Sequence, residues 1–187
     1  MVVRFNQKNG RFFFEDECHL MWGDVCGYVW GPQSDRVKIP IVNERKRQSY
    51  FGALNLFTGR ATIRKYDRAN SESTIRFLKD LLRANQRCKL TIFWDGVGYH
   101  RSKLVKSFLE KINKGKTGLK AKLNLVQLAP NAPEENPIED VWLSGKSYIR
   151  RQVNYNDFSE IQFDFEKSVT NRKYKFNKID RYKSYYE

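Results

Sequence analysis

The stretch "APNAPEENPIEDVW", residues 129–142, decides how this chain is interpreted. It holds three of the chain's five prolines and four of its acidic residues. Asn136 and Pro137 are typical of a helix start, and we expect a helix from there to about Arg151. Asn136 as N-cap and Glu139 three residues later would form a capping box, which would explain Glu139 without any catalytic role. Asp140 lies about 100° further round the helix and would point elsewhere.

Patterns outside this stretch predict an α/β fold. Alternating or continuous apolar runs predict strands at 11–17, 36–42, 49–56, 58–66, 88–95 and 122–128. Helical spacing predicts helices at 71–84 and 102–113, and Gly59 suits a tight hairpin turn between two of the strands. Hairpins followed by strand–helix–strand units give a mixed sheet flanked by helices. We expect one domain over residues 1–152 and a basic, Tyr-rich extension over 153–187, with a helix at 157–169.

Two further carboxylates stand at expected strand ends. Asp16 closes the first strand, and Asp95 closes "LTIFWD". Open α/β sheets place their sites at such ends, and a partly buried carboxylate costs free energy unless it is paired or binds a metal. The alternative is that each acid merely ends its strand at the solvent edge. Together with Glu139, the two aspartates suggest two Mg²⁺ or Mn²⁺ ions about 3.5–4 Å apart, which clamp the oxygens of an in-line phosphoryl transfer.

The charge balance indicates a polyanion partner. Lys and Arg number 35 against 21 Asp and Glu, a net charge of +14. A merely soluble basic protein is the alternative. Three cysteines without disulfide or zinc spacing indicate a reducing compartment, and we find no apolar run of membrane-spanning length and no signal-peptide core. We expect a soluble cytoplasmic protein that makes no membrane contact.

Basic residues gather near the proposed carboxylates. Residues 101–122 hold eight Lys or Arg against one Glu. A charge run is often only a solvated face, but its position here favours phosphate contacts without base reading. The candidate DNA-binding residues are His100, Arg101, Lys103, Lys106, Lys146, Arg150 and Arg151. For His100 two other roles stay open, bracing the site or simply packing in the fold.

Three motifs together resemble a known family. "FEDE", "FWDGVGYHRS" and "LAPNAPEENPIEDVW" are similar to the catalytic domain of DDE transposases of the Tc/mariner superfamily, in its bacterial insertion-sequence branch. The resemblance covers roughly residues 10–152, and the last motif is the most specific. It implies an RNase H-like fold with Asp16, Asp95 and Glu139 as the catalytic, metal-binding triad. It also implies metal-dependent DNA cleavage and strand transfer on transposon ends and target DNA, a homodimer on DNA and a nucleoid-associated, prokaryotic setting.

The chain departs from the family pattern in three places. Gly96 stands where the family usually has Asn, and 43 residues separate Asp95 from Glu139, which is longer than usual. Family members carry N-terminal helix-turn-helix domains, whereas Met1 begins about where the catalytic domain begins. We therefore expect a split-frame product, a fragment or a decayed copy, with a separately encoded helix-turn-helix portion as a partner. A non-catalytic DNA-binding or dimerising remnant and a structure-specific nuclease of the same fold are the competing interpretations.

Overall fold

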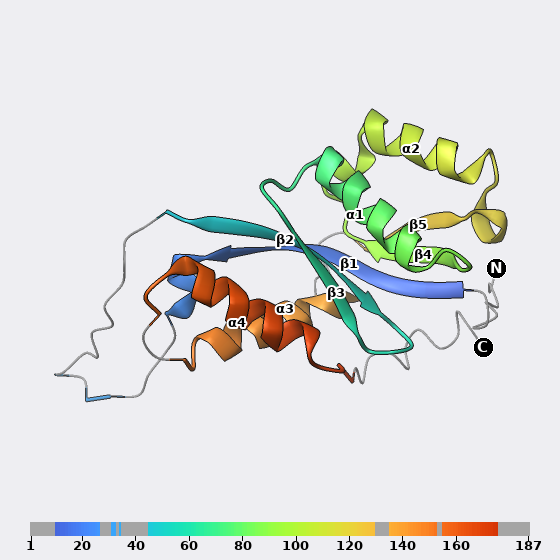
Figure 1. Ribbon diagram of the computed structural model, residues 1–187. Coiled ribbons are helices and arrows are strands. Elements are labelled where there is room, and N and C mark those ends of the chain that lie inside the picture. The colour runs from blue at the N-terminus through green and yellow to red at the C-terminus, as the bar shows by residue number, and fades with distance from the viewer. Residues whose placement is uncertain are drawn as a thin grey trace.

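A computed structural model describes residues 10–26, 31–32, 34, 45–129, 135–152 and 155–175. Within these ranges the chain forms a five-stranded sheet in the order β3-β2-β1-β4-β5 (Figure 1). The strands are β1 (Gly10–Met21), β2 (Arg47–Asn55), β3 (Ala61–Tyr66), β4 (Lys89–Trp94) and β5 (Leu123–Gln127). The strand expected at 36–42 lies outside the described residues.

The sheet is mixed, as the sequence predicts. β2 pairs antiparallel with both β1 and β3, whereas β4 pairs parallel with β1 and β5. Gly59, in the turn between β2 and β3, has a φ of 64°, which a residue with a side chain rarely adopts. The Asn55 side chain accepts hydrogen bonds from the backbone N–H groups of Phe57 and Thr58, which fixes the same turn.

Two pairs of helices cover opposite faces of the sheet (Figure 1). One pair is α1 (Ser71–Ala84) and α2 (Lys103–Asn113), which the side chains of Asn70 and Ser102 cap. The other pair is α3 (Ile138–Ile149) and α4 (Phe158–Thr170). Each pair encloses a hydrophobic cluster with its face of the sheet. Over the described ranges, no helix is both long and apolar enough to cross a membrane.

The helix expected at 157–169 is present as α4 and packs on α3. The space that a Cβ would need at Gly145 of α3 is taken by Phe165 and Val169 of α4, so the glycine permits this close approach. Phe165 and Val169 are fully buried in the cluster that also contains Phe12 and Tyr50. α4 therefore shares a core with the sheet, while the division of the chain at residue 152 stays a prediction.

The first strand is longer than predicted. β1 continues to Met21, so Asp16 lies within the strand and not at its end. β2 pairs with β1 from Phe13 through to Met21, and this pairing carries the strand past the acidic residues. Because side chains alternate along a strand, Phe14 and Asp16 face α3 and α4, whereas Glu15 faces α1 and α2.

Candidate active site

Asp16 lies under the third helix. The indole Nε1–H of Trp142, in α3, donates a hydrogen bond to Asp16 Oδ2 at 3.2 Å. Gly52 of β2 is the register partner of Asp16. A Cβ at Gly52 would collide with the Trp142 ring. Because Gly52 has no side chain, the indole can approach the sheet closely enough to reach the Asp16 carboxylate. Asp16 is thus held in one orientation by residues from two other elements.

The other two predicted carboxylates converge on Asp16. Burial is the largest cause of the raised pKa of Asp16, and the negative charges of Glu139, Glu17 and Asp95 add to it, so that this pKa is about 8. Asp95 follows β4 directly, and its side chain is 51% exposed. Glu139 is exposed in the first turn of α3. Chain segments far apart in sequence therefore bring Asp95 and Glu139 within electrostatic reach of Asp16.

The start of α3 differs from the capping box that the sequence predicts. The N-cap position is Pro137, which offers no capping side chain, and Glu139 N–H donates to the backbone oxygen of Asn136 at 3.1 Å. The Asn136 side chain points into the sheet instead, where its Nδ2 donates to the backbone oxygen of Glu15 at 3.3 Å. That tertiary bond replaces the local cap. The capping explanation of Glu139 is therefore wrong, and its carboxylate is left for another role.

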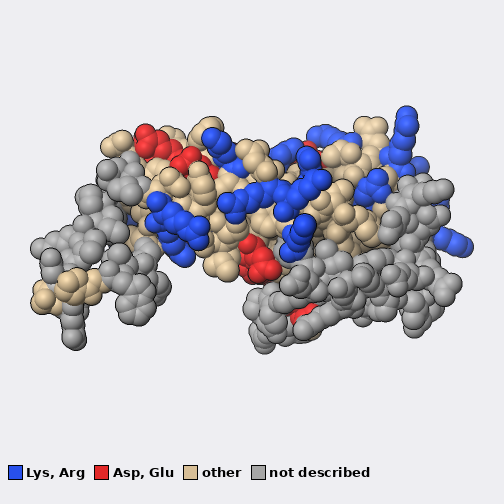
Figure 2. Space-filling view, turned by 90° about the horizontal axis from the view of Figure 1, so that it is seen from below, with Lys and Arg blue, Asp and Glu red and all other residues tan. Residues whose placement is uncertain are grey.

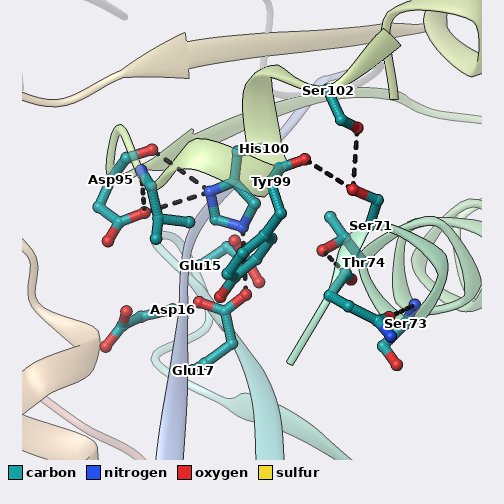
Figure 3. Close-up of polar contacts among 12 residues, drawn as sticks. Glu15, Asp16, Glu17, Ser71, Ser73, Thr74, Asp95, Tyr99, His100 and Ser102 are labelled. Carbon is teal, nitrogen blue, oxygen red and sulfur yellow. Dashed lines mark hydrogen bonds and ion pairs between the residues drawn. The ribbon is translucent and has the colours of Figure 1, made fainter. Parts of the chain in front are cut away.

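His100 is buried between two carboxylates. Its Nδ1 lies 3.1 Å from Asp95 Oδ1 and its Nε2 lies 3.1 Å from Glu17 Oε1 (Figure 3). Its ring also stacks on Trp94, with 4.0 Å between the ring centroids. Burial lowers the pKa of His100, but the bonds to Asp95 and Glu17 outweigh it and raise that pKa to about 10. The same contact with His100 is the main cause of the lowered pKa of Asp95. With 3% of the residue exposed, His100 is placed to brace Asp95 and not to touch DNA.

The remaining candidate DNA contacts divide into two groups. Arg101, Lys103, Lys106 and Arg151 are exposed. Lys146 of α3 and Arg150, the residue after the helix, both contact Asp24 in the short helix Trp22–Val25. Lys146 Nζ lies 3.2 Å from Asp24 Oδ1, and Arg150 Nε donates to the Asp24 backbone oxygen at 3.1 Å. Figure 2 shows Lys and Arg side chains spread over one face of the molecule. The four residues of the first group can therefore contact phosphates without breaking the contacts that Lys146 and Arg150 make with Asp24.

Gly96, which departs from the family pattern, lies beside the Gln127 side chain at the end of β5. A Cβ at position 96 would meet the terminal amide of that flexible side chain, which can move aside, so the contact does not require a glycine. Asp95 receives a hydrogen bond from the backbone N–H of Val97 to its Oδ1 at 3.2 Å.

Three contributors to the site were missed from the sequence. These are the indole of Trp142, the missing side chain of Gly52, and Glu17. Glu17 had a signal, since it lies in the "FEDE" motif next to Asp16. The other two contributions depend on the position of α3 over β2, which no local pattern reveals.

The donor set fits hard divalent cations. Asp16, Asp95 and Glu139 offer only carboxylate oxygens, the ligands that Mg²⁺ and Mn²⁺ prefer. The raised pKa of Asp16 means that its negative charge is unfavourable, first because the side chain is buried and second because the neighbouring carboxylates repel it. A bound cation would remove this repulsion, so the arrangement is suited to holding metal.

This repulsion predicts a pH-dependent stability. The pKa of Asp16 is about 8 in the folded chain against 3.8 ordinarily, so folding strengthens proton binding. The stabilisation from this group is complete below pH 3.8 and is lost as the pH rises toward 8. We expect urea unfolding at pH 8.5 to show that Mg²⁺ stabilises the protein, and to show a smaller effect of Mg²⁺ at pH 5. Equal effects of Mg²⁺ at both pH values would contradict the shifted pKa.

Comparisons with known proteins agree with this geometry. Residues 11–162 match the family model described as "DDE superfamily endonuclease". The structure is similar to a Mos1 mariner paired-end complex with Mn (TM-score 0.62, 13% identity, 87% of this chain and 49% of that chain). It is also similar to a mariner Mos1 paired-end complex with Mg (TM-score 0.57, 14% identity, 89% and 57%) and to the catalytic domain of Mos1 mariner transposase (TM-score 0.56, 13% identity, 87% and 71%).

These likenesses bear on the fold. At such low identity they show a shared architecture, and the expected RNase H-like α/β fold is confirmed. The chain spans about half the length of the first solved structures that it matches. A search of curated proteins gave no match.

Proposed function

We propose that this chain, which belongs to the DDE superfamily endonucleases, is the catalytic domain of a transposase that cuts DNA and joins the cut end to a target strand. One observation carries the proposal: Glu139 and Asp95, from two different elements, both raise the pKa of Asp16. Three converging carboxylates next to exposed basic side chains suit phosphoryl transfer on DNA.

Asp16, Asp95 and Glu139 would hold the metal. Two bound Mg²⁺ or Mn²⁺ ions would supply activation of the attacking oxygen and stabilisation of the leaving oxygen. Trp142 orients Asp16 through the indole hydrogen bond, and His100 orients Asp95 through its Nδ1. Arg101, Lys103 and Lys106 lie on the segment that follows Asp95 and would contact phosphates beside the site.

The wider assignment also belongs to this proposal. The resemblance of its motifs supports the bacterial insertion-sequence branch of the Tc/mariner superfamily as the proposed position of this chain. Two of the similar structures are Mos1 paired-end complexes, which supports action on transposon ends by a homodimer on DNA.

Cleavage with different cations tests the proposal. End-labelled duplex DNA carrying the element's ends should be nicked in Mg²⁺ or Mn²⁺, bound without efficient cutting in Ca²⁺, and left intact in excess chelator. Joining of the cut end to a second duplex separates a transposase from a structure-specific nuclease. Undiminished cutting in chelator would rule out the proposed chemistry, and binding without cutting in any cation would favour the non-catalytic remnant.

We expect weak, sequence-independent DNA binding by this chain alone. Its +14 charge favours phosphate contacts, whose affinity falls steeply as counterions are added. Lys103→Gln and Lys106→Gln should each lower the slope of log affinity against log salt by about 1. Arg83→Gln, at the far end of α1 and 76% exposed, should leave that slope unchanged. Fluorescence anisotropy at several salt concentrations measures the affinity and its dependence on salt for each variant. Tight, salt-insensitive binding to one sequence would contradict this prediction.

A further inference from the structure

A second group of ligand-type side chains lies on the other face of β1. Glu15 and Glu17 point away from Asp16 toward the short helix Gly98–Arg101, which carries His100 (Figure 3). One ligand atom from each of Glu15, Glu17 and His100 lies within 4.8 Å of the other two. These three side chains are called the Glu15 cluster below. The cluster shares no ligand with the Asp16, Asp95 and Glu139 carboxylates.

Glu15 is the member that lacks a partner. It is 0% exposed, and within the described part of the chain neither carboxylate oxygen has a hydrogen-bond partner. Glu17 and His100, by contrast, bond to each other at 3.1 Å. A buried carboxylate without a partner is strongly unfavourable, because even a neutral polar group costs free energy when it is buried without a hydrogen bond. A proton would remove the charge of Glu15 but would still leave its carboxyl without a described hydrogen-bond partner.

A metal ion would satisfy all three side chains at once. We propose that the Glu15 cluster binds a first-row transition-metal dication, such as Zn²⁺ or Mn²⁺, separately from the catalytic carboxylates. Two carboxylates and one imidazole are a mixed oxygen and nitrogen set, which suits these ions better than Mg²⁺.

The surroundings of His100 match those of a metal ligand. Histidines that bind metal through one ring nitrogen commonly give the other N–H to a carboxylate. Here His100 Nε2 faces the cluster and Nδ1 faces Asp95 Oδ1 at 3.1 Å. The ring is also held against Trp94. The bound ion would therefore fix the His100 ring and, through it, Asp95, so it has a structural role and takes no part in the phosphoryl transfer.

Nitrogen ligation distinguishes the two sites. The catalytic carboxylates offer only oxygen, and His19 and His100 are the chain's two histidines. Pulsed EPR of untagged protein with bound Mn²⁺ detects coupling to an imidazole nitrogen. The experiment uses the Asp16→Asn, Glu139→Gln double variant, in which the catalytic site is disabled. We expect nitrogen coupling in this background. Mn²⁺ bound with oxygen ligands only, or no bound Mn²⁺, would overturn the proposal.

Matched variants assign the signal. In the same background Glu15→Gln, which keeps the shape of the side chain, should abolish the nitrogen coupling. His19→Gln should keep it, because His19 lies at an exposed position and its Nδ1 is bonded to Ser49. Zn²⁺ should raise the melting temperature of the double variant but not that of its Glu15→Gln derivative, with folding checked by circular dichroism. Coupling that survives Glu15→Gln and disappears in His19→Gln would place the ion elsewhere. No DNA enters these measurements, so their outcome is independent of whether the chain cuts DNA.

Discussion

Asp16→Asn and Asp95→Asn should both abolish DNA cleavage while shifting protein stability in opposite directions. Each change removes a proposed anionic metal ligand, and the loss of cleavage should exceed the roughly 10–100-fold effect of removing an outer-shell partner. Burial and neighbouring carboxylates raise the pKa of Asp16, so the neutral Asn should stabilise the metal-free protein at pH 8.5. The bond from His100 lowers the pKa of Asp95, so the neutral Asn should destabilise it there.

Urea unfolding and a cleavage assay on the same protein samples measure both effects. The metal-free state matters, because a bound cation would hide the repulsion around Asp16. Asp140→Asn serves as the control, since Asp140 is exposed on the next position after Glu139. It should change cleavage little. Stability shifts of the same sign for Asp16→Asn and Asp95→Asn would contradict the electrostatic description of the site.

Gly52→Ala should damage both folding and cleavage. The new methyl group would enter space that the Trp142 ring occupies and would press on Ile138 Cδ1 at 2.9 Å. Overpacking of this kind typically costs about 1–3 kcal/mol. Trp142 can relieve the clash only by moving α3, and that movement would take its indole from Asp16 and shift Glu139.

A second glycine provides the comparison for that change. Gly23→Ala adds the same methyl group where no atom lies within 4 Å, so it should leave both stability and cleavage nearly unchanged. The free energy of unfolding and the cleavage rate should be measured for both variants. A Gly52→Ala protein that is as stable and as active as the Gly23→Ala protein would show that α3 is not held against β2 as described.

Local patterns predicted the parts of this fold that local forces determine. The helices expected at 71–84 and 102–113 and the turn at Gly59 are all present, because each depends on a few neighbouring residues. The negative charges of Glu139 and Asp95 both act on Asp16, as expected for three motif carboxylates that share a site.

Tertiary contacts explain where the sequence reasoning failed. β1 extends beyond its expected end because β2 pairs with it up to Met21. Asn136 does not cap α3 because Glu15, 121 positions earlier in the chain, offers its backbone oxygen. His100 carries no signal that would distinguish a surface contact from a buried brace, since Glu17, one of its two carboxylate partners, lies 83 positions earlier in the chain. Such contacts exist only once the sheet has formed.

Glu139 provides the most direct test, because the capping explanation for it has been removed. We would measure metal-dependent nicking by Glu139→Gln and by Asp140→Asn, each in Mg²⁺ and in Mn²⁺, with folding confirmed by thermal melting. A neutral amide at position 139 cannot replace an anionic ligand. We predict that Glu139→Gln folds normally and cuts no DNA, whereas Asp140→Asn cuts like the unchanged chain. Cleavage that survives in Glu139→Gln would contradict the assignment of Asp16, Asp95 and Glu139 as the catalytic carboxylates.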